Sequence, residues 1–144
     1  MIKVSSLSLT VLDLSYNLIG NEGAKFMAAA LIVPHANLRI LNLKFNKIKS
    51  SGLCALAKAV GSNKALKYFY AWGNQFDEAA ATAFEEVCLL NRLDDKTTDI
   101  RPYRVDGACR VARVDNDCIY RKFKWSENRK KYENINDPED LKEE

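Results

Sequence analysis

The sequence predicts an α/β fold in which three short strand–helix units stack into a solenoid, followed by a C-terminal β-hairpin or meander that acts as a cap and by an extended tail. Two observations indicate this architecture. A pattern of leucines that ends in an asparagine occurs three times, with Asn17, Asn46 and Asn74 spaced 29 and 28 residues apart. Apolar residues at helical spacing follow each asparagine. Self-similarity at a fixed period of this length is typical of stacked repeats.

The strand of each unit is expected to lie just before its asparagine. The clearest copy runs from Leu38 to Ile48, with Leu41, Leu43 and Asn46 at the pattern positions. The corresponding residues of the other two copies are Leu9, Leu12, Leu14, Asn17 and Ile19, and Leu66, Phe69, Ala71, Asn74 and Phe76. Because side chains alternate along a strand, the pattern residues point to the core and their neighbours to the opposite face of the sheet.

Each asparagine is expected to hydrogen-bond to the backbone, because its amide can pair with peptide N–H and C=O groups where the chain leaves the sheet. Stacked copies would then form an internal hydrogen-bonded ladder, and this structural role is favoured over a polar binding site. A helix should follow, with N-caps at Asn21, Ser50 and Asp77. The predicted buried stripes of the three helices are Ala24, Met27 and Leu31; Leu53, Leu56 and Val60; and Ala81, Phe84 and Cys88. The predicted small residues at the helix starts are Gly23, Gly52 and Ala80.

Period, consensus and the helix start Gly20-Asn21-Glu22-Gly23 resemble ribonuclease-inhibitor-type leucine-rich repeats over residues 9–92. Two short motifs, Ala71–Ala79 and Pro102–Gly107, further resemble the C-terminal part of one member of this family. The resemblance implies a curved, non-catalytic, protein-binding module. The narrower resemblance suggests a ciliary, germ-cell or nucleolar setting. Because residues 1–8 are too short for a capping unit, a truncated form, a fragment, or a partner on the N-terminal edge is expected.

The outward positions of the three strands form the predicted binding surface. Aromatic character increases toward the third unit, where Tyr68, Tyr70 and Trp72 are expected side by side. Tyrosine and tryptophan dominate protein–protein hot spots, so a protein partner is expected here. The polar flank of this surface is predicted to consist of Asp13, Asn42 and Lys44. The alternative is that the C-terminal cap itself covers the aromatic residues.

Residues 1–92 are predicted to form the repeats, 93–125 the β cap and 126–144 a charged, extended or disordered tail. The turn Asp106-Gly107 between β-formers predicts a hairpin of Pro102–Val105 with Cys109–Val114, and Cys118–Trp125 is expected to add a third strand. Such a meander would cover the open edge of the sheet. The tail combines a basic block with an acidic one, and it offers a second partner surface. The basic residues are Arg121, Lys122, Lys124, Arg129, Lys130 and Lys131.

No enzyme, cofactor or metal site is predicted. The single histidine, His35, has neither a nucleophile nor metal ligands at suitable spacing, and no phosphate-binding glycine loop is present. No apolar run spans a membrane, and the irregular spacing of the four cysteines favours reduced thiols, so a cytoplasmic protein is expected, with the cilium, axoneme or nucleus as alternatives. The favoured function is a scaffold or assembly subunit. The alternatives are an enzyme inhibitor or a nucleic-acid-associated protein that acts through the basic tail, which the adjacent acidic block disfavours.

Overall fold

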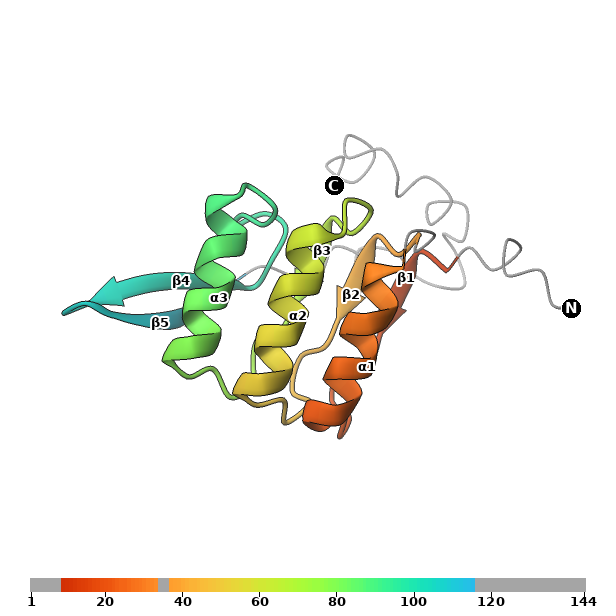
Figure 1. The fold of residues 1–144 in the computed structure, drawn as a ribbon, viewed down its shortest axis with the longest axis horizontal. Coiled ribbons are helices and arrows are strands. Elements are labelled where there is room, and N and C mark those ends of the chain that lie inside the picture. Colours follow the sequence, from red (N-terminus) through yellow and green to blue (C-terminus); the bar gives the residue numbers. More distant parts are fainter. Residues whose placement is uncertain (1–8, 34–36, 116–144) are drawn as a thin grey trace, which may run out of the picture.

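The computed structural model describes residues 9–33 and 37–115 (Figure 1). Three strand–helix units come first. They are β1 (Val11–Asp13) with α1 (Gly20–Ile32), β2 (Ile40–Asn42) with α2 (Ser50–Ser62), and β3 (Tyr68–Tyr70) with α3 (Glu78–Leu89). Two longer strands follow, β4 (Ile100–Val105) and β5 (Ala108–Arg113).

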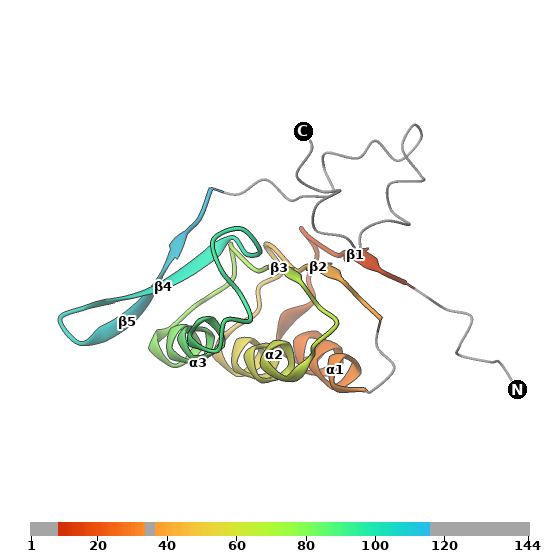
Figure 2. The same cartoon turned by 90° about the horizontal axis from the view of Figure 1, so that it is seen from above.

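The three short strands form one parallel sheet in the order β1-β2-β3. Leu12 pairs with Leu41, and Leu41 pairs with Phe69, so the predicted pattern residues are successive rungs of one sheet. The three helices lie side by side on one face of this sheet, as Figure 2 shows. The predicted stacking of α/β repeats with a period of 28–29 residues is confirmed, and so is the predicted register of their strands.

The core lies between the sheet and the helices. Leu41 and Phe69 from the strands, and Leu43 directly after β2, are fully buried in one cluster with Leu56 and Phe84 of the helices. The rings of Phe69 and Phe84 stack with centroids 5.7 Å apart. The predicted helix stripes are correct, with Met27 and Cys88 only partly buried. No single repeat could cover its own stripe, so each depends on its neighbour for stability.

The asparagine ladder is present. Asn46 Oδ1 accepts hydrogen bonds from Asn17 N and Ile19 N, and Asn74 Oδ1 accepts from Asn46 N and Ile48 N. The Nδ2 atom of Asn46 donates to Leu14 O at 2.9 Å, in the preceding repeat. The amides of Asn46 and Asn74 therefore each join two repeats, as the sequence pattern predicted.

Two of the three predicted N-caps are wrong. Helix α1 begins at Gly20 and α2 at Ser50, and neither helix has a cap hydrogen bond from the side chain before it. Asn21 lies inside α1, and its Oδ1 accepts from Lys49 N and Gly52 N, so it caps the next helix instead of its own. Asp77 is a true N-cap, because its side chain accepts from Ala80 N at 2.9 Å.

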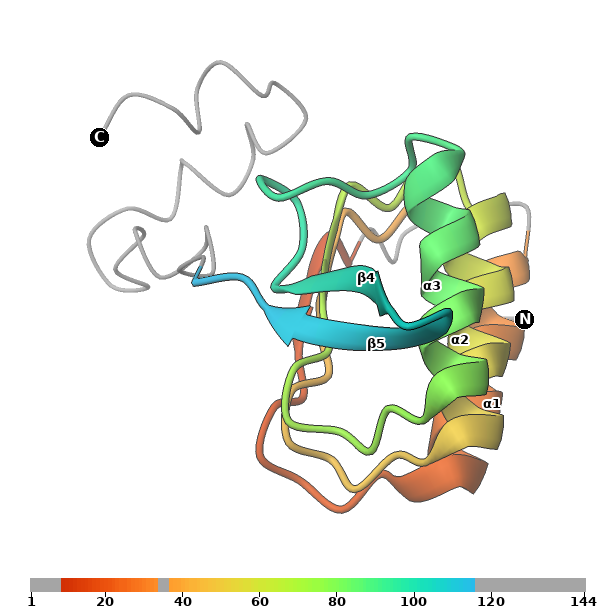
Figure 3. The same cartoon turned by 90° about the vertical axis from the view of Figure 1, so that its left-hand side faces the viewer.

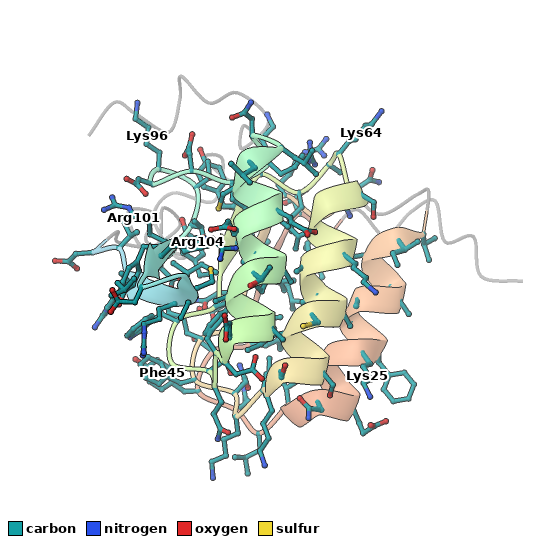
Figure 4. The ribbon with its side chains drawn as sticks, turned by 60° about the vertical axis from the view of Figure 1, so that its left-hand side comes forward. Lys25, Phe45, Lys64, Lys96, Arg101 and Arg104 are labelled. Atoms are coloured by element: carbon teal, nitrogen blue, oxygen red, sulfur yellow. The ribbon has the colours of Figure 1, made fainter. Side chains whose placement is uncertain are left out.

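Strands β4 and β5 form the predicted antiparallel hairpin, beginning two residues earlier than expected (Figure 3). Asp106 and Gly107 both have positive φ, as the predicted two-residue turn requires. The hairpin lies beside α3, and Figure 4 shows Arg104 reaching toward that helix. The expected third strand, 118–125, and the tail, 126–144, lie outside the described residues.

Candidate protein-binding surface

The register places the predicted surface residues as expected. Asp13, Asn42 and Tyr70 pair in one row across the sheet, and Tyr68, two residues earlier on β3, pairs with Ile40. The sheet hydrogen bonds continue past the strands, because Tyr16 N donates to Lys44 O and Phe45 N donates to Trp72 O. The three repeats therefore keep one register through the loop that follows each strand.

The expected exposure of these residues is wrong for four of the six. Tyr70 and Asn42 are fully buried, and Lys44 and Tyr68 are 7% and 8% exposed. Of the six, only Asp13 is exposed and Trp72 half-buried. The aromatic rows are therefore mainly part of the folded interior, and the alternative that the C-terminal cap covers them stays a prediction. Binding of a partner through Tyr68, Tyr70, Trp72, Lys44, Asn42 and Asp13 stays a prediction.

Asp99 and Lys44 form a buried ion pair beside Tyr70. The ammonium of Lys44 lies 3.7 Å from the Asp99 carboxylate and 5.5 Å from the centroid of the Tyr70 ring. The same carboxylate accepts from Ala71 N at 2.8 Å and from Trp72 N at 3.2 Å. Burial raises the pKa of Asp99, and the two peptide N–H groups and Lys44 oppose that shift. Lys44 is thus engaged in a buried ion pair and is not a free polar flank.

The Asp99 segment is a fourth rung of the sheet, which the sequence reasoning missed. Phe69 N donates to Thr97 O at 2.9 Å, and Phe69 forms a parallel bridge with Thr98. A signal was available, because Asp99 follows Tyr70 by 29 residues, one repeat period. It was weak, because residues 91–96 lack the leucine pattern.

A hollow of about 430 Å³ remains open between the third repeat and the hairpin. Aromatic side chains of Trp72, Phe76 and Tyr103 line it, together with the charged Asp77 and Arg110. The N–H of Ala80 holds the pKa of Asp77 below its usual range, so this carboxylate is ionised at neutral pH. The hollow therefore offers ring faces beside fixed charge of both signs, a combination suited to a peptide side chain.

The hairpin wall of this hollow is held to α3 by Glu85. The Glu85 carboxylate accepts from Arg104 Nη2 at 2.7 Å and from Arg104 Nε at 3.1 Å. Cys109 Sγ donates to Glu85 Oε2 at 3.7 Å, the same oxygen that accepts from Arg104 Nε. The hydrogen bond from Arg104 holds the pKa of Glu85 below its usual range, so the pair stays charged.

A second aromatic feature lies on the loops beside the hollow. The rings of Tyr16 and Phe45 stack with centroids 4.8 Å apart, and Tyr16 is 67% exposed. Phe45 lies over Gly73, where an added Cβ would come within 2.3 Å of the ring. Figure 4 shows Phe45 below the hairpin. Tyr16, Phe45 and Gly73 thus occupy equivalent positions in the three repeats. Sequence reasoning missed this aromatic feature, although each of the three residues directly precedes a ladder asparagine.

The remaining predicted sites fall outside this surface. The basic tail residues Arg121, Lys122, Lys124, Arg129, Lys130 and Lys131, together with His35, lie outside the described residues. Within residues 9–33 and 37–115, no three His, Cys, Asp or Glu side chains are grouped so as to hold a metal ion. None of the helices that the structure describes has the length and apolar character needed to cross a bilayer. In the same part of the chain, Cys54, Cys88 and Cys109 are free thiols.

Comparison with known families agrees with this geometry. A family profile described as Leucine Rich repeat matches residues 5–28 and 35–57, which contain the first two strand–helix units. Together with the asparagine ladder and the parallel register, this shows that the chain contains leucine-rich repeats. Such domains generally mediate protein–protein interaction and are generally non-catalytic.

Within this class the chain is similar to leucine-rich repeat-containing protein 34, the member that the two C-terminal motifs indicated. It is 36% identical to the mouse protein over 90 residues, which are 62% of this chain and 21% of the relative. Identity to the rat protein is 37% over 90 residues, again 62% and 21% of the two chains. Mouse NACHT, LRR and PYD domains-containing protein 4E is 32% identical over 102 residues, 71% of this chain and 10% of that one. The match thus spans about a fifth of the first two relatives.

Proposed function

We propose that this chain is a non-catalytic protein-binding module that serves as a scaffold or assembly subunit of a larger complex. The observation that carries the proposal is the hollow beside Trp72, which continues the predicted aromatic surface where that surface stays open. In this proposal residues 1–92 act as a solenoid and residues 93–125 as its cap. The tail, 126–144, and the N-terminal edge offer further contacts to protein partners.

The chemistry of the hollow supports recognition of a protein segment. Tyr103, at 40% exposure, and half-buried Trp72 can bury apolar area on binding with little loss of side-chain entropy. Arg110 and Glu78 at the rim can pair with charges of either sign. The Glu85–Arg104 pair holds the hairpin wall against α3, so part of the ordering cost of binding is already met.

The experiment is quantitative co-purification of tagged full chains from cells. Tyr103→Ala removes one aromatic wall, and Val105→Ala is the matched control because Val105 is on the same strand and 46% exposed but does not line the hollow. Partners that depend on the hollow should fall at least about tenfold with Tyr103→Ala and stay with Val105→Ala, as expected for the loss of a hot spot. Equal recovery with both variants overturns the assignment of the hollow.

Tyr70→Ala is a poor probe of binding because Tyr70 is fully buried. Its truncation would leave a large cavity and unfold part of the chain.

The inhibitor hypothesis shares the hollow with the scaffold hypothesis, so Tyr103→Ala tests both. Identification of a captured enzyme whose activity falls on binding would favour the inhibitor. A ciliary or axonemal location is part of the scaffold proposal, with the cytoplasm and nucleus as alternatives. Fluorescence imaging of the full chain tests the location.

A further inference from the structure

The hairpin places Tyr103 and Arg110 side by side at the hollow. The two residues are direct partners in the antiparallel register, and such partners project from the same face of a sheet. The next pair, Arg104 and Cys109, projects from the opposite face, where Arg104 bonds to Glu85 of α3 and Cys109 is 2% exposed. One face of the hairpin is therefore fixed against α3, and the other carries Tyr103 and Arg110, which both line the hollow.

Arg110 differs from the two arginines of β4 in its ion pairing. Arg101 pairs with Asp95, and Arg104 pairs with Glu85. Arg110 is exposed, and the ion pairs formed between residues that the structure describes do not include it. Its guanidinium presents a planar fork of donors that matches a carboxylate in two parallel hydrogen bonds. The hollow therefore contains a cation whose carboxylate partner is still to be supplied.

The two carboxylates that line the hollow have their charge offset from within the fold. Asp77 caps α3, and Glu78 follows in the first turn, where the positive end of the helix dipole opposes their negative charge. Bonding to Glu85, and to a smaller extent the charge of Glu78, raise the pKa of Arg104, so Glu78 also acts on that cation. Of the charged groups that line the hollow in the described part of the chain, Arg110 is thus the one that no neighbour offsets.

Ring faces lie within the same hollow as the guanidinium of Arg110. Tyr103 is 40% exposed, and Trp72 and Phe76 are half-buried. The ring of Phe76 is held edge-on against Phe84, with centroids 5.7 Å apart. The volume of about 430 Å³ is within the range of ligand pockets. An aromatic or aliphatic side chain that enters here would bury apolar area on rings that are already placed.

We propose that the hollow binds an extended segment of a partner protein that combines a carboxylate with an apolar side chain. An Asp or Glu side chain of the segment pairs with Arg110, and a neighbouring aromatic or aliphatic side chain packs among Trp72, Phe76 and Tyr103. The occupant follows from charge complementarity, because the charge left without an offset is positive. This assignment rests on the function proposed above and specifies the partner of the same site.

The experiment screens the immobilised full chain against random heptapeptides displayed on phage, and fluorescence polarisation then measures the affinity of the enriched peptides. These peptides should carry Asp or Glu next to an aromatic or aliphatic residue. Arg110→Ala should weaken their binding at least about tenfold, as expected for loss of a charge-assisted hydrogen bond. Arg110→Lys should restore only part of the affinity, because it keeps the charge and lacks the planar fork. Arg110→Glu should instead enrich peptides with Lys or Arg.

Arg113→Ala is the matched control. Arg113 is also exposed on β5 and outside the ion pairs of the described residues, but it projects from the opposite face and does not line the hollow. This variant should bind the enriched peptides as the unchanged chain does. Arg110→Ala should shift the thermal midpoint by no more than about 3 °C, because an exposed and unpaired side chain contributes little to stability. Loss of binding is then separate from loss of folding.

Several results overturn the proposal: no enriched peptide, enriched peptides without an acidic residue, unchanged affinity with Arg110→Ala, or an equal loss with Arg113→Ala. The acidic residues of 133–144 are a competing source of carboxylate. Each chain is therefore also made with these residues changed to their amides. Peptide binding that appears only in the amide version would identify the chain's own tail as the occupant and overturns the assignment to a partner.

Co-purification separates failure of this proposal from failure of the hollow. Partners lost with Tyr103→Ala but kept with Arg110→Ala would leave the hollow as the binding site and overturn only the carboxylate pairing. Partners kept with both variants would overturn the function proposed for the hollow. Partners lost with both variants and kept with Arg113→Ala are the result expected here.

Discussion

Substitution of Asp99 by alanine is expected to lower the free energy of unfolding by about 3–5 kcal/mol, the cost of breaking a buried charge pair. The carboxylate accepts from Ala71 N and Trp72 N and pairs with the Lys44 ammonium at 3.7 Å. The side chains of Lys44 and Asp99 are 8% and 2% exposed, so water cannot replace either partner. Alanine would therefore leave a buried cation and two backbone donors without their acceptor.

The magnitude can be divided between these contacts. An unsatisfied buried donor costs about 1–3 kcal/mol, and Ala71 N, in a fully buried residue, is the donor most affected. Trp72 is half-buried, so its N–H contributes less. Asp99→Asn keeps an acceptor for Ala71 N but removes the charge opposite Lys44, and it should cost about 1–3 kcal/mol. The double variant Lys44→Met with Asp99→Asn should recover part of this loss, with a coupling of about 0.5–3 kcal/mol.

Urea unfolding, followed by far-ultraviolet circular dichroism, measures the five free energies of the unchanged chain, Asp99→Ala, Asp99→Asn, Lys44→Met and the double variant. A value for Asp99→Ala within about 0.5 kcal/mol of the unchanged chain, the range of ordinary surface substitutions, would refute the assignment of Asp99 as the acceptor that closes the sheet.

The pH dependence of stability is a second test. Because burial raises the pKa of Asp99, the folded state holds the proton to higher pH than the unfolded state. The contribution of this group to stability therefore falls as pH rises from its ordinary pKa through the raised one, and Asp99→Asn removes that slope.

Three further predictions concern the repeats. Asn46→Ala removes a fully buried amide that bonds two repeats and should cost about 2–3 kcal/mol in urea unfolding, whereas Asn17→Ala at the exposed end should cost less than about 1 kcal/mol. Asp77→Ala should cost about 1 kcal/mol through loss of the N-cap. A backbone N–H of α3 lowers the pKa of Asp77, so its charge-dependent contribution is present above about pH 4 and is lost as pH falls through the lowered pKa. Thermal melts across pH 2–7 should show this loss, and Asp77→Asn should not. Gly52→Ala places a Cβ 2.9 Å from Ala24 Cβ and should cost about 1–3 kcal/mol, and an unchanged urea midpoint would contradict this close helix contact.

The repeat period and the strand register were predictable from the sequence. A side-chain period of two assigns Leu12, Leu41 and Phe69 to the buried face, and asparagines 28–29 residues apart at the strand ends indicate the register that pairs them. The ladder asparagines and the hairpin turn were predictable for a related reason. Their roles follow from local chemistry, an amide at a strand end and an Asp-Gly pair with positive φ.

The solvent exposure of the predicted surface residues could not be predicted from the repeat pattern. Tyr70 and Lys44 occupy outward positions on the sheet, and alternation alone assigns them to the surface. In the folded chain both side chains are buried, and Lys44 pairs with Asp99, which follows Tyr70 by 29 residues and lies beside a fourth rung of the sheet. The leucine pattern had already ended at that point, so the local sequence did not predict a fourth rung.

The caps show the same division between local and long-range information. Asn21 is a good N-cap residue by type, and propensity assigned it to its own helix. In the folded chain its Oδ1 is 2.8 Å from Lys49 N, so it caps the next helix, because stacking brings residues 28 positions apart into contact. The sequence by itself determined which residues repeat and which face each one takes. Only the tertiary structure decided which repeat each side chain hydrogen-bonds to and which outward side chains remain exposed to solvent. Both outcomes depend on the distance between neighbouring repeats.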